Sequence, residues 1–127
     1  PLSFYLVLKK IATPKKLEVS YISFESGNGK DHLKVKLQDF LYANSSENYI
    51  TIWYGLKGQS KKHLIRKPLK VLEQELKPYP EIQKTHRSYL VNSRNIQTVK
   101  QIKGNLYLEI KEASVPVSKQ NQHHFLG

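Results

Sequence analysis

The stretch that says most about the fold is residues 84–95, which read Lys-Thr-His-Arg-Ser-Tyr-Leu-Val-Asn-Ser-Arg-Asn. A polar group comes first, an apolar run at Tyr89, Leu90 and Val91 follows, and a second polar group closes the stretch. This order predicts a polar segment, a strand, and then a short turn that the Asn92 side chain can cap. The stretch therefore indicates strands joined by short connections.

The segments on both sides of this stretch show strand-like alternation. Apolar and polar residues alternate over residues 33–37, 50–54 and 106–110, and a period of two is typical of half-buried antiparallel strands. Glycine and asparagine mark turns at residues 27–29, 55–58 and 104–105. We therefore expect a mainly β fold built from antiparallel sheets.

One segment departs from the strand pattern and predicts a helix over residues 68–77. Its apolar face carries three leucines, Leu69, Leu72 and Leu76. Pro68 suits the first helical position, where no backbone N–H is needed, and Glu73 can pair with Lys77 one turn later. A weaker helical pattern covers residues 118–125. The sequence thus predicts one clear short helix and a second helix at the C-terminus.

Composition and charge restrict the function classes. The 127 residues are enough for one domain with its own core, and the absence of cysteine excludes disulfides and cysteine-ligated zinc. The net charge is +11. Between Lys57 and Lys103 twelve Lys/Arg face only three acids. Such a concentration favours a polyanionic partner, most often nucleic acid.

The first residues differ in composition from the rest. An apolar run at residues 2–8 is followed by Lys9 and Lys10, and residues 12–16 are short, basic and contain Pro14. Residues 1–16 are predicted to be a linker or the tail of an upstream segment. Three interpretations of the apolar run stay open: the end of a membrane helix, an interdomain helix or a first strand. Residues 17–127 then form the domain.

Catalytic patterns are missing from the sequence. The carboxylates are scattered, no glycine-rich phosphate loop or nucleophile elbow occurs, and the five histidines lack metal-ligand spacing. We therefore predict that the chain is not an enzyme and needs no cofactor or metal.

Three polar stretches next to strand patterns carry the functional argument: residues 43–49, 84–88 and 115–119. Taken singly, they are typical of a surface turn, a solvated strand edge and a helix cap. Together they offer the side chains that read duplex DNA. Asparagine can bond adenine, arginine can bond guanine, and lysine, histidine, serine and threonine can bond phosphates.

Several ordered motifs resemble those of one family. Residues 86–92 resemble the H-R-S-Y/F-I/L-V-N signature of LytTR domains. Residues 40–43 and 48–50 are similar to its I-x-Y-I-x-A…N-Y element, and residues 66–73 to its R-x-x-L-K-x-L-E helix entry. Residues 95–96 and 115–119 are similar to its N-I and I-P-V-S-R elements. The resemblance covers about residues 20–126.

The resemblance implies an elongated fold of antiparallel sheets with little helix. It implies loops that enter successive major grooves, usually at direct repeats, with base contacts from Asn48, Arg87 and Lys119. Loop or backbone support would come from His86, Ser88, Asn92 and Ser118. Lys119 stands where many members have arginine, so this position lacks the planar fork that discriminates guanine.

These expectations describe the DNA-binding output domain of a bacterial transcription regulator, such as the response regulator of a two-component system. A shared phosphate-binding contribution would come from six further side chains: Lys61, Lys62, Arg66, Lys67, Arg94 and Lys100. The expected partner is double-stranded DNA, with a homodimer on paired sites. An upstream sensor, receiver or membrane domain would control a cytoplasmic domain whose parent protein is either free or membrane-anchored.

Two other functions fit parts of the sequence. A β-rich module for RNA or single strands would stack bases on Tyr49, Trp53, Tyr54 and Tyr107. The other alternative is a catalytic domain of the nuclease kind. Competition between duplex and single strand tests the first alternative, and incubation with DNA and magnesium tests the second.

Overall fold

The computed structural model describes residues 20–126, which contain ten strands. They are β1 (Tyr21–Glu25), β2 (His32–Lys36), β3 (Phe40–Ser46), β4 (Tyr49–Leu56), β5 (Gln59–Arg66), β6 (Ile82–His86), β7 (Tyr89–Asn92), β8 (Thr98–Ile102), β9 (Asn105–Ile110) and β10 (Ala113–Val117). The helical segments are α2 (Leu69–Glu75) and the 3-10 helices η1 (Leu37–Asp39), η2 (Ser93–Asn95) and η3 (Lys119–His124).

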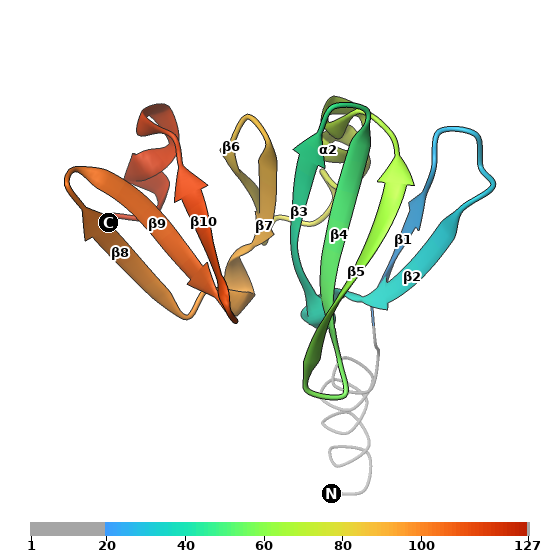
Figure 1. The fold of residues 1–127 in the computed structure, drawn as a ribbon, viewed down its shortest axis with the longest axis horizontal. Coiled ribbons are helices and arrows are strands. Elements are labelled where there is room, and N and C mark those ends of the chain that lie inside the picture. The colour runs from blue at the N-terminus through green and yellow to red at the C-terminus, as the bar shows by residue number, and fades with distance from the viewer. Residues whose placement is uncertain (1–19, 127) are drawn as a thin grey trace, which may run out of the picture.

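The strands form three antiparallel sheets that follow one another along the longest axis of the molecule (Figure 1). The central sheet has five strands in the order β5-β4-β3-β7-β6. A sheet of β1 and β2 lies on one side, and a sheet in the order β10-β9-β8 lies on the other. The prediction of a mainly β fold of elongated antiparallel sheets is therefore confirmed.

The middle strands of the central sheet, β3 and β7, are covered on both faces. Neighbouring residues of a strand point to opposite sides, and in these two strands both sets are largely buried. Ala43 and Leu90 pack with Phe24 and Leu72 into a core shared with β1, β2 and α2. Tyr42 and Val91 face the other way and pack against the three-stranded sheet. Two cores thus hold the three sheets together.

The predicted helix forms, with two differences. Leu69, Leu72 and Leu76 are buried as expected, but Pro68 is the N-cap in an extended conformation and not the first helical residue. The expected pair of Glu73 with Lys77 is also wrong, because the Glu73 carboxylate lies 3.6 Å from the Lys84 ammonium on β6. The predicted C-terminal helix is the 3-10 helix η3.

The connections are tighter than the polar stretches suggested. Ser46 pairs with Tyr49 and His86 pairs with Tyr89 across two-residue turns. Residues 43–46, 84–86 and 115–117, which we expected in loops, belong to β3, β6 and β10. Cross-strand pairing therefore overrides the turn preference of asparagine and serine here.

The predicted linker at residues 1–16 lies outside the described residues. Within residues 20–126, none of the helices combines the length and the apolar character that a membrane crossing requires.

Candidate nucleic-acid interface

The β3–β4 turn consists of Glu47 and Asn48, and both side chains are exposed. The Asn48 carbonyl accepts a hydrogen bond from the Lys67 backbone N–H at 3.2 Å, which ties the turn to the segment that leads into α2. Arg66, the last residue of β5, pairs with Tyr49, and its guanidinium lies 6.0 Å from the centre of the Tyr49 ring. An amide and a guanidinium therefore project from the same end of the sheet.

The β6–β7 turn consists of Arg87 and Ser88. The Ser88 backbone N–H donates to Nδ1 of His86 at 3.3 Å, and the His86 ring meets Tyr89 edge to face. Arg87 itself is exposed. Side chains that flank the turn therefore contact it, and among residues 20–126 the Arg87 guanidinium takes part in none of the salt bridges.

A backbone hydrogen bond joins these two turns. The Ser45 N–H on β3 donates to the Ser88 carbonyl at 2.9 Å, and β3 and β7 are neighbours in the sheet. The centres of the two turns are separated by two strand spacings, or about 10 Å. Asn48 and Arg87 are thus close enough for one duplex to meet both.

The third segment, Ser118 and Lys119, is attached to β6. The Ser118 N–H donates to the Thr85 carbonyl at 2.8 Å, and the Asn121 side-chain amide donates to the same carbonyl at 3.3 Å. The Asn121 amide also bonds the Ser118 hydroxyl at 2.8 Å. The Lys119 ammonium donates to the Gly104 carbonyl in the β8–β9 turn at 3.1 Å. Lys119 therefore lies across the surface toward the last sheet.

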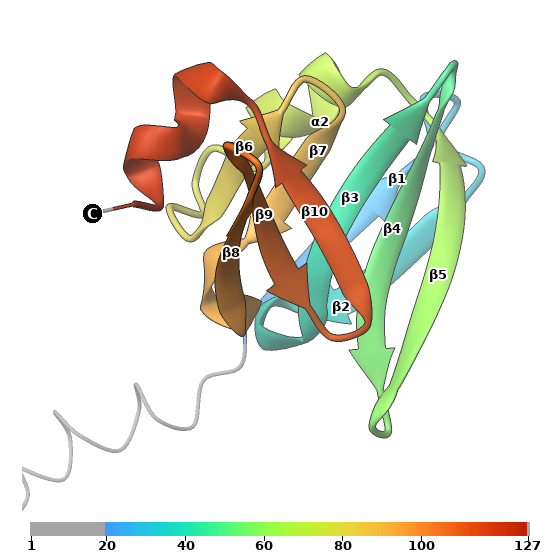
Figure 2. The ribbon, with the colours of Figure 1, turned by 60° about the vertical axis from the view of Figure 1, so that its left-hand side comes forward.

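We call the two turns and this segment the loop edge: Glu47, Asn48, Arg87, Ser88, Ser118 and Lys119. Figures 1 and 2 show all three parts at the same end of the molecule. The three residues expected to contact bases are brought together there.

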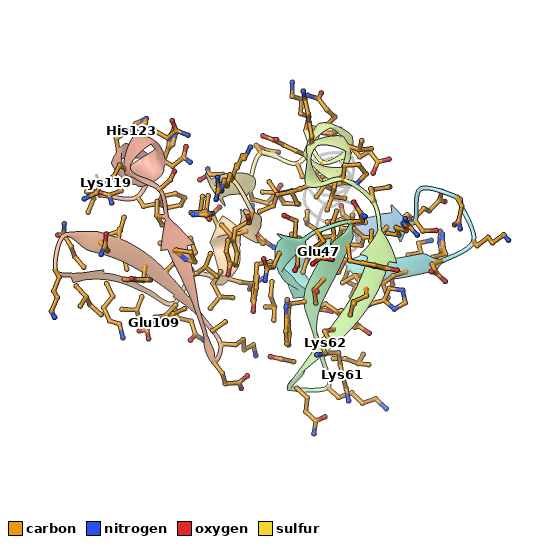
Figure 3. The ribbon with its side chains drawn as sticks, turned by 45° about the horizontal axis from the view of Figure 1, so that its top comes forward. Glu47, Lys61, Lys62, Glu109, Lys119 and His123 are labelled. Carbon is orange, nitrogen blue, oxygen red and sulfur yellow. The ribbon has the colours of Figure 1, made fainter. Side chains whose placement is uncertain are left out.

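Other predicted contacts lie elsewhere. Lys61 and Lys62 lie nearer the start of β5, whereas Arg66 is the last residue of the strand. Figure 3 shows both lysines away from Glu47 of the β3–β4 turn. The Lys62 ammonium lies 5.7 Å from the centre of the Trp53 ring. Arg94, in η2, lies 3.5 Å from the Glu81 carboxylate. The structure does not bring these three cations to the loop edge.

Two further lysines are already paired. Lys67, which we expected to contact phosphates, is only 6% exposed, and its ammonium lies 2.7 Å from the Glu75 carboxylate. Its burial and its ion pair with Glu75 weigh against a contact with phosphates. Lys100 is half-exposed and lies 3.1 Å from the Glu109 carboxylate.

Asn92 lies at the far end of β7 from Arg87 and is fully buried. Its side-chain amide donates to the carbonyls of Leu37 at 2.9 Å and Phe40 at 3.0 Å. Its oxygen accepts from the Arg94 N–H at 3.2 Å, so it caps η2 as predicted. Asn92 therefore fixes the start of β3 and has no route to a DNA backbone.

The aromatic residues do not form an open stacking surface. Trp53 stacks on Tyr42 with ring centres 5.8 Å apart, and Tyr54 packs against the first core. Burial raises the pKa of the Tyr42 hydroxyl, and the neighbouring Tyr89 raises it further. Within the part of the chain that the structure describes, Tyr21 and Tyr49 are the aromatic residues classed as exposed. This arrangement weighs against base stacking as the main mode of binding.

Sequence reasoning missed the contribution of the β1–β2 turn. Gly27 donates its N–H to the Arg66 carbonyl at 2.8 Å, which places Asn28 beside the β3–β4 turn. Together they border a groove of about 560 Å³ lined by Gly27, Asn28, Glu47, Asn48, Arg66, Lys67 and Pro68. The Gly-Asn-Gly sequence predicted the β1–β2 turn. No local pattern predicted that this turn lies beside the β3–β4 turn.

Comparisons with known proteins agree with this fold. Residues 30–126 match the family model of the LytTr DNA-binding domain. The fold is similar to a solved LytTr DNA-binding domain from Bacillus cereus, whose parent is named as a methyl-accepting/DNA response regulator. That similarity has a TM-score of 0.59 and 19% sequence identity, and it covers 84% of this chain and 93% of the other.

Proposed function

Because this chain belongs to the LytTR family of DNA-binding domains, we propose that its loop edge reads a specific duplex sequence through the major groove. Asn48 would bond adenine, Arg87 would make two parallel bonds to guanine, and Lys119 would donate to a single acceptor. Arg66 and the His86–Ser88 segment would contact or position the phosphate backbone.

The observation that carries the proposal is the pair of backbone hydrogen bonds along the loop edge. Ser45 to Ser88 at 2.9 Å and Ser118 to Thr85 at 2.8 Å tie three separate segments into one frame. Base readout requires side chains on a rigid support, because a loose donor loses its geometric discrimination. The exposed Arg87 on such a support is suited to this role.

The parent protein is proposed to be a bacterial transcription regulator. The Bacillus cereus domain, named as part of a response regulator, supports an arrangement in which an upstream receiver, sensor or membrane domain controls DNA binding. The apolar run at residues 2–8 supports the membrane version. The domain would work in the cytoplasm on direct-repeat sites, occupied by two copies.

Site selection from a random duplex library at ~150 mM salt tests the proposal, since non-specific affinity is suppressed there. Recovery of a short repeated motif is expected. Arg87→Ala should then lose about 1–3 kcal/mol of specific binding and relax one base position. Arg94→Ala, an arginine change away from the loop edge, is the matched control and should leave the motif intact.

Equal loss of specific and random binding by Arg87→Ala would remove its readout role. If no motif emerges, or if single strands compete as well as duplex, the single-strand alternative replaces the proposal. Cleavage of DNA in the presence of magnesium would reveal a nuclease instead.

A further inference from the structure

Four two-residue turns of this fold have a first residue with positive φ that is not glycine. They are Glu47 (φ 56°), Lys57 (φ 52°), Lys103 (φ 51°) and Lys111 (φ 55°). Three of the four are lysines, which suit a protein with a polyanionic partner. The exception, Glu47, lies in the β3–β4 turn, directly before Asn48 on the loop edge.

Glu47 is exposed and lines the groove that Asn48, Arg66 and Asn28 also line. Within residues 20–126 its carboxylate takes part in none of the salt bridges. Figure 3 places Glu47 at the tip of the hairpin, away from Lys61 and Lys62 at the other end. The carboxylate therefore lies where DNA would approach and has no structural partner there.

A carboxylate at such a place is repelled by phosphates and lowers affinity for every sequence. It can recover this loss only by accepting a hydrogen bond from a base. In the major groove guanine and thymine present acceptors, and adenine presents an acceptor beside its amino group, whereas cytosine presents an amino donor. An acceptor-only side chain therefore favours cytosine and disfavours the other bases.

We propose that Glu47 is a specificity-determining residue that accepts a hydrogen bond from the amino group of a cytosine next to the base read by Asn48. The spacing fits, because adjacent Cα atoms are about 3.8 Å apart and successive bases rise about 3.4 Å. This role rests on the proposed function of the loop edge. Glu47 would discriminate between bases partly by repulsion, because its carboxylate is repelled by base acceptors, and this repulsion suppresses binding to wrong sites.

Parallel site selections with wild type, Glu47→Gln and Glu112→Gln test the role of Glu47. Glutamine keeps the length and the backbone demand of Glu47 but can bond adenine on two atoms. The preferred base should therefore change from cytosine to adenine at one position, with a change in the cytosine-to-adenine binding ratio of ~5- to 150-fold. The rest of the motif should be unchanged.

Glu112→Gln is the matched control, because Glu112 lies in the two-residue β9–β10 turn, away from the loop edge. It removes the same charge but should leave every base preference unaltered. Glu47→Gly separates turn strain from readout, since glycine accepts a positive φ freely. It should raise the melting temperature and flatten the preference at the same position.

Three results would overturn the role of Glu47. If wild type selects a motif and both Glu47 variants select the same motif with the same strength, Glu47 is only a turn residue. If wild type selects no motif at all, the proposed function fails and this role fails with it. A motif whose preference at the affected position is for guanine or thymine also contradicts the mechanism.

Discussion

Asn92 offers a sharp test of the division between folding and DNA reading. It stands within the sequence signature that resembles the DNA-binding family, yet it is buried at the end of β7 remote from Arg87. Asn92→Ala would remove two side-chain donations, to Leu37 and Phe40, and the cap on the Arg94 N–H. At ~0.5–1.5 kcal/mol for each hydrogen bond, the loss is about 2–4 kcal/mol.

The surroundings favour the lower part of that range. The Phe40 carbonyl keeps a donor, because the Asn95 amide also bonds it at 2.7 Å. The Leu37 carbonyl keeps the Phe40 backbone N–H. For a domain of this size about 1 kcal/mol shifts the melting temperature by roughly 5 °C. Asn92→Ala should therefore lose about 2–3 kcal/mol and lower the melting temperature by roughly 10–15 °C, as circular dichroism during heating would show.

The binding arm of the same test uses a specific duplex well below the melting temperature. The folded fraction of Asn92→Ala should bind with the affinity and salt dependence of wild type, because no atom of Asn92 reaches the loop edge. Asn92→Asp sharpens the result, since a carboxylate would replace the donor between two carbonyl oxygens. Its folded state would hold a proton to higher pH than the unfolded chain, so its stability relative to wild type should fall as pH rises. An unchanged melting temperature with lost specific binding would refute the structural assignment.

Three further predictions follow from the placement of side chains. Arg66→Gln should reduce the slope of log K against log salt by about one, whereas Lys61→Gln should leave the slope unchanged, as fluorescence titrations would show. Thr85→Val should raise the melting temperature by a few degrees, because the buried Thr85 hydroxyl has no hydrogen-bond partner among the described residues. Lys119→Arg should sharpen selection for one guanine, because a guanidinium can bond the Gly104 carbonyl and still present its fork. Equal guanine preference in both proteins would contradict this.

The spacing of apolar residues along the chain predicted several strands and the helix correctly. Alternation over residues 50–54 and 106–110 predicted β4 and β9, and the spacing of the leucines predicted α2. Contacts between side chains of different strands and helices could not be predicted from this spacing. Glu73 had a favourable partner one turn away at Lys77, but the fold brings Lys84 of β6 beside it. Tertiary contacts therefore decided the pairing, and no local rule contains them.

The candidate site divides in the same way. Residue type and the family resemblance singled out Asn48, Arg87 and Lys119, but their proximity depends on pairings between distant strands. Tyr42 pairs with Val91 across β3 and β7. The register of β6 shifts between Lys84 and His86, and the Thr85 carbonyl at that irregularity receives the start of the third segment. An irregularity of one residue is not visible in a pattern of period two.

The distribution of charge in space differs from what the sequence average suggests. The basic stretch from Lys57 to Lys103 looks like one surface, but β5 alone carries Lys61 near its start and Arg66 at its last residue. Lys67 between strand and helix is buried against Glu75. Only part of the net charge of +11 can therefore face one duplex. A salt slope smaller than the charge suggests is the expected consequence of this fold, because counterion release counts only the phosphates that are contacted.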